Sequence, residues 1–320
     1  MSLNIVKSTD PLTINNIIML IYGDPGIWKT SLAFTAKRPI LFDFDKGGHR
    51  APNRKDLVPI NEWYEVANLS PHDLKDYDTI IIDTAGRALD VITDSLKNDK
   101  NNTRRDGQLS QQGYGKLGSI FTDWLKTLRC MGKDIVLLAH TAEDKDGDDI
   151  IKRPDMVGGS KREAYKIADM MAYMTKEHSR GGTVRVLNFV SQPSFLAKDS
   201  GGMGNVVVAP VTDNPNQLAH IIQATKDHIN NFSEQQTKAY QDLSDLRSEL
   251  MSAGDADSFN KLITTLNKNH MLYAQMRQDI WSTAKSIASV EFDEANKCFV
   301  DIDDVCEPID EPANESEVPA

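Results

Sequence analysis

The chain of 320 residues is long enough for one large α/β domain and a smaller appendage. Its composition, 40% hydrophobic and 26% charged, is typical of a globular protein, and no apolar run in the sequence is long enough to span a membrane. Residues 1–9 contain no basic-then-apolar leader, and the cysteines form no CxxC pair, so we expect a cytoplasmic protein without structural zinc.

The net charge of −11 is concentrated at the C-terminus. From Glu291 onward there are eleven acidic residues and one basic residue, Lys297, whereas the preceding 290 residues carry 36 acidic and 35 basic residues. Residues 291–320 are therefore predicted to be an acidic, disordered tail. Such a tail would act as a solubilising segment, as a docking segment for a partner such as a single-strand-binding protein, or as a DNA mimic.

Strands alternate with helices in the N-terminal two thirds of the chain. Continuous apolar runs predict strands buried on both faces, and apolar residues at helical spacing predict the helices between them. This order is typical of an α/β fold in which a mainly parallel sheet lies between helices. The predicted strands are 17–22, 40–44, 79–82, 135–139, 184–190 and 205–209, and the predicted helices are 30–36, 87–97 and 116–130.

The character of the sequence changes after Thr212. Residues 213–290 are polar, contain no strand-like run, and repeat leucines at helical spacing. We therefore expect three parts, namely an α/β domain over residues 1–212, a small helical appendage over 213–290, and the acidic tail over 291–320.

A phosphate-binding loop is predicted where the first strand ends and the first helix opens. Backbone N–H groups at a helix N-terminus bind phosphate, the Lys29 ammonium would reach the β- and γ-phosphates, and the Thr30 hydroxyl would ligate Mg²⁺. The alternative is a chance match in a tight turn. The loop consists of Gly23, Asp24, Pro25, Gly26, Ile27, Trp28, Lys29, Thr30 and Ser31.

Trp28 departs from the usual pattern of this loop, in which glycine precedes the lysine. A side chain is sterically allowed there if the residue has a helical φ, but an indole would crowd the γ-phosphate or lie over the base. Binding of ATP is therefore a firmer expectation than its rapid hydrolysis.

Polar side chains lie at the ends of three further predicted strands. Asp83 follows the strand 79–82 in the manner of a Walker B motif and would hold Mg²⁺. Asp43 and Asp45 lie at the end of the second strand, where a carboxylate would orient or deprotonate the attacking water, or would only cap the next helix. His140 follows the strand 135–139 and would sense the γ-phosphate, unless it is an ordinary core histidine.

The order of these motifs resembles the RecA-like ATPases and, more closely, the phage-encoded AAA_24-type nucleotide-binding proteins, some of which act in single-strand annealing or recombination. The resemblance covers about residues 14–212. It implies a RecA-like core over residues 1–212, Asp45 as the catalytic carboxylate, hydrolysis between the subunits of a homo-oligomer, and Lys198 as a lysine that acts on a neighbour's site. The segments that carry it are 23–31, 43–48, 78–84, 113–117 and 137–141.

The resemblance also implies two DNA-contacting loops, at 97–115 and 141–161. Basic and aromatic side chains suit single-strand backbone contacts and base stacking, although the five acidic residues within 143–149 of the second loop are unusual for a DNA-binding segment. Ordinary solvated loops are the alternative. The candidate contacts are Arg104, Arg105, Tyr114, Lys152, Arg153, Lys161 and Arg162.

These features predict a Mg²⁺-dependent RecA-like ATPase that binds single-stranded DNA and supports recombination or annealing, in the host cytoplasm if it is phage-encoded. A nucleotide-dependent assembly or switch protein with a protein partner and slow or no hydrolysis is the alternative, because the body of the chain has no excess of basic charge. A metabolic kinase is the third possible class of protein, and no lid or acceptor motif in the sequence supports it.

Overall fold

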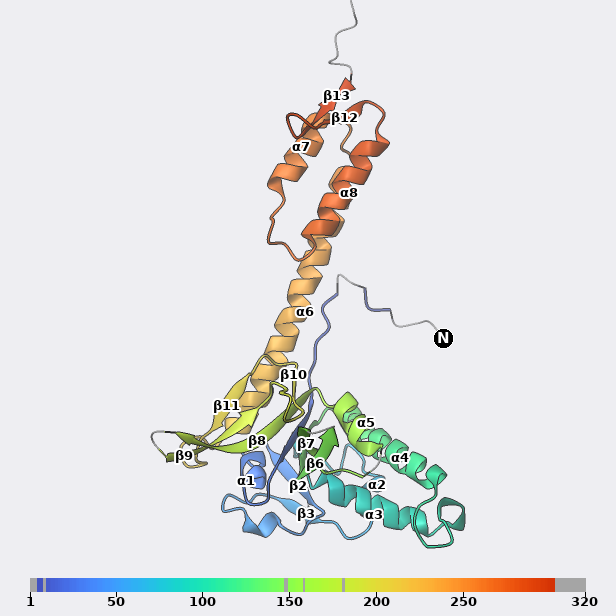
Figure 1. Ribbon diagram of the computed structural model, residues 1–320, viewed down its shortest axis with the longest axis vertical. Helices are drawn as coiled ribbons and strands as arrows, with labels where there is room; N and C mark the ends of the chain where they lie inside the picture. Colours follow the sequence, from blue (N-terminus) through green and yellow to red (C-terminus); the bar gives the residue numbers. More distant parts are fainter. Residues whose placement is uncertain (1–4, 8–9, 147–148, 158, 180–181, 303–320) are drawn as a thin grey trace, which may run out of the picture. The chain divides into compact units, whose positions relative to one another are not determined.

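The computed structural model describes residues 5–7, 10–146, 149–157, 159–179 and 182–302 (Figure 1). The chain divides into two compact units, one comprising Thr13–Asn231 and the other comprising Met1–Leu12 with Phe232–Ala320. The boundary falls within the long helix α6 (Gln217–Leu250). Among the described residues, no helix is both long enough and apolar enough to cross a bilayer.

A nine-stranded sheet forms the centre of the first unit, in the order β11-β9-β8-β1-β5-β4-β2-β3, with β10 paired to β8. The six strands from β8 to β3 in that order run parallel, β9 and β10 pair with β8 in antiparallel register, and β11 pairs with β9 in antiparallel register. The predicted α/β class with a mainly parallel sheet is therefore confirmed. The strands are β1 (Ile18–Gly23), β2 (Pro39–Asp43), β3 (Leu57–Pro59), β4 (Thr79–Asp83), β5 (Asp134–Ala139), β8 (Met170–Ser179), β9 (Gly182–Asn188), β10 (Lys198–Asp199) and β11 (Asn205–Val208).

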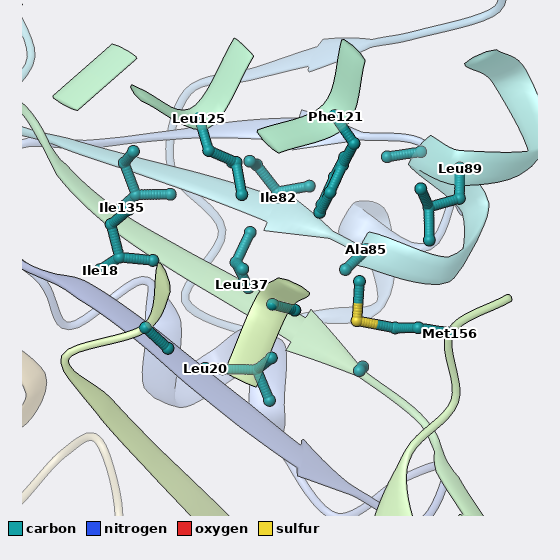
Figure 2. Close-up of a cluster of buried hydrophobic side chains, with 14 of the residues drawn as sticks. Ile18, Leu20, Ile82, Ala85, Leu89, Phe121, Leu125, Ile135, Leu137 and Met156 are labelled. Atoms are coloured by element: carbon teal, nitrogen blue, oxygen red, sulfur yellow. The ribbon is translucent and has the colours of Figure 1, made fainter. Parts of the chain in front are cut away.

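Helices cover both faces of this sheet. Alternate residues of β1 point to opposite faces, so Leu20 packs in one hydrophobic cluster and Ile21 in another. The first cluster lies under α3 (Ala85–Lys97), α4 (Gln111–Cys130) and α5 (Ser160–Ile167), and Figure 2 shows Phe121 of α4 above Ile82 and Leu137 of the sheet. The second cluster lies under α1 (Lys29–Ala33) and the start of α6. The short helices are η1 (Gly48–Arg50), α2 (Tyr64–Ala67) and η2 (Lys100–Asn102).

The predicted domain boundary at residue 212 is wrong. Leu218, Ile221 and Ile222 of α6 are buried against the sheet, and Lys226 forms an ion pair of 2.7 Å with the buried Asp134. The polar composition of residues 213–231 concealed one apolar stripe that covers the sheet. The first turns of α6 are therefore part of the α/β unit.

The segment predicted as a second flexible loop, 141–161, contains a hairpin. Strands β6 (Thr141–Asp146) and β7 (Asp149–Pro154) pair in antiparallel register from Thr141 opposite Pro154. The many acidic residues obscured the strand signal, because opposite charges on the two strands pair across the hairpin. Strand β8 was also missed, because its methionines and alanine favour helices in isolation.

The second unit contains α7 (Ala256–Thr265), α8 (Tyr273–Ser286) and a hairpin of β12 (Val290–Asp293) and β13 (Cys298–Asp301). The hairpin contradicts the prediction that the tail is disordered from residue 291. Phe299 is buried among Phe259, Trp281 and Phe292, with ring centroids within 6 Å of it. Alternating apolar residues thus override the local acidic charge, and the tail from Asp303 onward lies outside the described residues.

Candidate nucleotide-binding site

Four parallel strands, β1, β5, β4 and β2, end at one edge of the sheet. Ligands of open α/β sheets bind at this edge, and a small cavity of about 170 Å³ lies there. Its lining brings together residues from four separate segments of the chain. They are Pro25, Gly26, Ile27, Trp28, Lys29, Thr30, Ser31, Asp45, Gly47, Arg50, Ala51, Asp83 and His140.

The loop between β1 and α1 holds Lys29 in a buried position. Its Nζ donates hydrogen bonds to the carbonyl oxygens of Gly23, at 2.7 Å, and Asp24, at 3.0 Å. Burial lowers the pKa of Lys29, and the nearby carboxylates of Asp83, Asp24 and Asp45 oppose that effect. A buried ammonium that is bound only by neutral carbonyls is prepared to exchange them for phosphate oxygens.

Glycine is required at Gly23 because a Cβ there would lie 2.7 Å from the carbonyl oxygen of Met174. Trp28, by contrast, adopts φ 80° and ψ 25°, the left-handed conformation that favours glycine. The helical φ that would have accommodated this side chain is therefore not observed. The indole is 47% exposed and stacks on the Arg185 guanidinium of β9, 3.5 Å from the ring centroid. Arg185 thus draws the indole toward β9, on the opposite side of β1 from β4 and β5.

Thr30 and Asp83 meet as predicted for the metal-binding pair, since the Thr30 hydroxyl donates to Asp83 Oδ2 at 2.7 Å. Burial raises the pKa of the Asp83 carboxyl to about 6, although the hydrogen bond from Thr30 and the charge of Lys29 oppose the shift. A carboxylate that is costly to keep ionised without a cation, beside a hydroxyl, fits Mg²⁺. Within the described part of the chain no cluster of three His, Cys, Asp or Glu side chains could hold a metal by itself. Phosphate oxygens would therefore complete the coordination.

The two aspartates at the C-terminal end of β2, Asp43 and Asp45, have different roles. Asp43 is only 3% exposed, and its oxygens accept hydrogen bonds from the backbone N–H groups of Gly47, at 3.0 Å, and Gly48, at 2.9 Å. Asp43 therefore fixes the turn after β2, which is the structural alternative for this pair. Asp45 is partly exposed and lines the cavity, so it keeps the position expected of the catalytic carboxylate.

His140 follows the last residue of β5 and lines the same cavity. Its Nδ1 is buried and has no hydrogen-bond partner among the described residues. Burial lowers the pKa of His140, with a further contribution from the positive charge of Lys29. A neutral imidazole with an unpaired nitrogen at the cavity wall is suited to bind a phosphate oxygen or the attacking water.

Two arginines of this region were missed at the sequence level. Arg50, in η1, lines the cavity, and Arg87, in the first turn of α3, lies with its Nε 3.7 Å from Asp45 Oδ1. Each arginine follows a recognised strand-end aspartate by four or five residues, and this short spacing was the available signal.

The predicted DNA contacts are dispersed. Arg104 and Arg105 are exposed in the turn before α4, and Tyr114 is exposed in the first turn of α4. On the hairpin, the Lys152 ammonium lies 5.7 Å from the Tyr173 ring centroid and Arg153 is paired with Asp144.

The last two candidates of this set lie on α5. Arg162 is exposed on that helix. The side chain of Lys161 lies outside the described residues.

Lys198 is partly buried. It lies on β10, where its Nζ donates to the Ala168 carbonyl at 2.7 Å. Its partner in the sheet is Met171 near the start of β8, whereas the phosphate loop follows the end of the parallel strand β1. Lys198 therefore lies away from this chain's own cavity, and its action on a neighbouring subunit remains a prediction.

The fold and the cavity together define a P-loop nucleotide-binding protein of the RecA-like class, as the sequence predicted. The AAA_24 family, described as an AAA domain, matches residues 15–200, which is more than half of the chain. The chain belongs to that family. None of the curated protein sequences compared with this chain matches it.

Two archaeal proteins are among the solved structures to which the chain is similar. A KaiC-like protein from Pyrococcus horikoshii OT3 is 12% identical, with 60% of this chain and 89% of that protein covered and a TM-score of 0.32. The flagellar accessory protein FlaH from Methanocaldococcus jannaschii is also 12% identical, with 61% and 90% covered and a TM-score of 0.33. At these scores neither similarity supports any conclusion about this chain.

Proposed function

We propose that this protein is a Mg²⁺-dependent ATPase in which nucleotide state controls the binding of single-stranded DNA during recombination or strand annealing. The observation that carries the ATPase part is the convergence of Lys29, Asp45 and His140 on one cavity beside the Thr30–Asp83 pair. These side chains come from four strand ends and supply the groups that phosphoryl transfer needs.

Each group has a role that follows from its surroundings. Lys29 would leave the loop carbonyls and bind the β- and γ-phosphates, while the loop N–H groups bind the β-phosphate. Asp45 would orient the attacking water and accept its proton, and His140 would bind the γ-phosphate through its unpaired nitrogen. Mg²⁺, held by Thr30 and Asp83, would neutralise charge that develops on the phosphates.

Phosphate release from ATP tests this activity. The wild-type protein is expected to release phosphate with Mg²⁺ and to stop in excess chelator, and Asp83→Asn is expected to release much less phosphate at the same Mg²⁺ concentration. Asp76→Asn, an exposed acid outside the cavity, is the matched control. Phosphate release that is identical in the wild type and Asp83→Asn would refute the proposed site.

Two arrangements support single-stranded DNA as the partner. Arg104, Arg105 and Tyr114 are all exposed within eleven residues of one another, which offers two cations and an aromatic ring to a flexible strand. The β6–β7 hairpin begins at Thr141, directly after His140, so a change at the γ-phosphate would reach the hairpin through one peptide bond. The resemblance to phage-encoded annealing ATPases gives the biological setting of the proposal.

A protein partner is the second candidate, and a specific observation favours it. The hairpin is not a cationic surface, because Arg153 is paired with Asp144 and the exposed Glu143 and Asp149 add negative charge. An unstructured oligonucleotide, titrated with ADP, with ATP and without nucleotide at two salt concentrations, separates the two candidates. DNA binding that requires ATP and weakens with salt supports the first. No binding tighter than micromolar in any state supports the protein partner.

A further inference from the structure

Arg87 occupies a fixed place beside the cavity that no motif assigns. It is the third residue of α3, which begins two residues after Asp83. The Thr84 side chain caps this helix by accepting from the Arg87 N–H, and a Cβ on Gly86 would lie 2.9 Å from the Asp155 carbonyl oxygen. The first turn of α3 is therefore held between the Walker B strand and the end of the hairpin, and the backbone of Arg87 is held with it.

The side chain of Arg87, in contrast, is held weakly. Its Nε lies 3.7 Å from Asp45 Oδ1, beyond hydrogen-bond distance, and its Nη1 donates to Asp90 Oδ2 at 3.1 Å. The Arg87 side chain is 61% exposed and that of Asp90 is 51% exposed. Exposed pairs of this kind contribute little to stability, so the guanidinium exchanges partners at small cost.

The charge of Arg87 already reaches the reaction centre. Its Nε lies 3.7 Å from the carboxylate of Asp45, which lines the cavity, and its positive charge contributes to the lowered pKa of His140. Within the described residues, Asp45 and Asp90 are the only acidic partners of Arg87. A guanidinium has five N–H donors, so most of its hydrogen-bonding capacity is unused.

We propose that Arg87 is a catalytic cation supplied by the same chain, which exchanges Asp45 for the terminal phosphate when a nucleoside triphosphate binds. The proposal rests on the proposed ATPase function. A planar guanidinium binds two phosphate oxygens at once, so a γ-phosphate competes effectively with a carboxylate 3.7 Å away. A diphosphate has no terminal oxygens at that position, and Arg87 then stays with Asp45.

The exchange would release Asp45 for its own role. With Arg87 on the phosphate, the Asp45 carboxylate is free to accept a proton from water as the water oxygen bonds to the γ-phosphorus. The bond between the γ-phosphorus and the β–γ bridging oxygen breaks, and its electron pair leaves with the nucleoside diphosphate. Arg87 stabilises the charge on the transferred oxygens, and the products are the diphosphate and inorganic phosphate.

Two substitutions of Arg87 and one control substitution test the proposal. The measurements are kcat and the equilibrium affinities for ATP and for ADP. Arg87→Ala is expected to lower kcat by about 10³-fold, the lower end for a catalytic arginine, and to weaken ATP binding but not ADP binding. Arg87→Lys, which keeps the charge without the planar fork, is expected to recover part of kcat. Lys126→Ala removes an exposed cation of α4 that also pairs with an acid one turn away, so it is the matched control and is expected to leave both readouts unchanged.

The outcomes separate this proposal from the proposed function. If the wild type hydrolyses ATP and Arg87→Ala does so equally fast with an unchanged ratio of ATP to ADP affinity, the role of Arg87 is refuted and the ATPase stands. If the wild type does not hydrolyse ATP but Arg87→Ala alone loses the preference for ATP over ADP, hydrolysis is refuted and the contact of Arg87 with the terminal phosphate stands. If no Arg87 variant changes that preference in such a protein, both fail.

Discussion

The strand-end cavity and the two proposed DNA segments are built in opposite ways. Around the cavity, Lys29 and Asp83 are buried, and each is hydrogen-bonded to other atoms of the site. In the DNA segments, Arg104 and Arg105 are exposed, whereas Arg153 is paired with an acid on the neighbouring strand. Burying a charge costs free energy unless a partner or a ligand stabilises it, whereas water stabilises an exposed charge. The buried charges of the cavity therefore indicate a function more strongly than the exposed charges of the DNA segments.

The largest effect is expected from the buried cation. Lys29→Ala removes a buried ammonium from the phosphate loop, and we expect nucleotide affinity to fall by about 2–5 kcal/mol, the usual cost of truncating a buried charged partner. Lys37→Ala is the matched control, because its side chain is 75% exposed. Calorimetric titration with ATP measures both. If Lys29→Ala and Lys37→Ala bind ATP with equal affinity, the buried lysine does not bind the phosphates.

An intermediate effect is expected in the DNA segment before α4. Replacing Arg104 and Arg105 together by alanine removes two cations, so the plot of log affinity for single-stranded DNA against log salt should become shallower by about 1.4. The same loss should occur for oligonucleotides of any sequence. The matched control is Arg277→Ala in α8, which carries an exposed cation in the second unit. An unchanged salt slope would show that this segment does not touch the DNA backbone.

A smaller effect is expected at the strained position of the phosphate loop. Trp28 has φ 80°, so Trp28→Gly should be more stable than Trp28→Ala by about 1 kcal/mol, since both lack the indole and only alanine keeps a Cβ in the left-handed region. Urea denaturation measures the difference. A greater stability of the alanine variant would mean that the loop does not keep this backbone conformation.

The smallest effect is a dependence of stability on pH that arises from His140. Its pKa in the folded protein lies below the usual value of 6.5, so the unfolded chain binds more protons in the window just below pH 6.5. The free energy of unfolding should therefore fall as the pH is lowered through that window. His140→Gln should be less sensitive to pH over the same range, and an identical pH profile for the two proteins would contradict the burial of a neutral imidazole.

Much of the site was predictable because its residues stand at strand ends that the apolar runs already locate. The positions of Lys29, Asp83 and His140 followed from local pattern alone, since parallel strands bring their ends to one edge. The different roles of Asp43 and Asp45 could not be predicted from the local pattern. They depend on the folded turn after β2, in which the backbone N–H groups of Gly47 and Gly48 donate to Asp43.

Other features depended on tertiary contacts that no local pattern contains. The cation–aromatic stack of Arg185 on Trp28 joins residues far apart in the sequence. The β12–β13 hairpin was predicted as disordered because its charge suggested a tail, whereas the burial of Phe299 decides its structure. The start of α6 was assigned to the wrong domain for the same reason, since only the fold shows which surface Leu218 covers.

The central claim is that the strand-end cavity hydrolyses a nucleotide with Asp45 as the carboxylate that activates water. The most direct measurement compares ATP affinity and single-turnover phosphate release for the wild type and Asp45→Asn. The account predicts an affinity within a few-fold of the wild type and a hydrolysis rate reduced by about 10²–10⁴-fold, the usual contribution of a general base. An Asp45→Asn protein that releases phosphate at the wild-type rate would contradict the account.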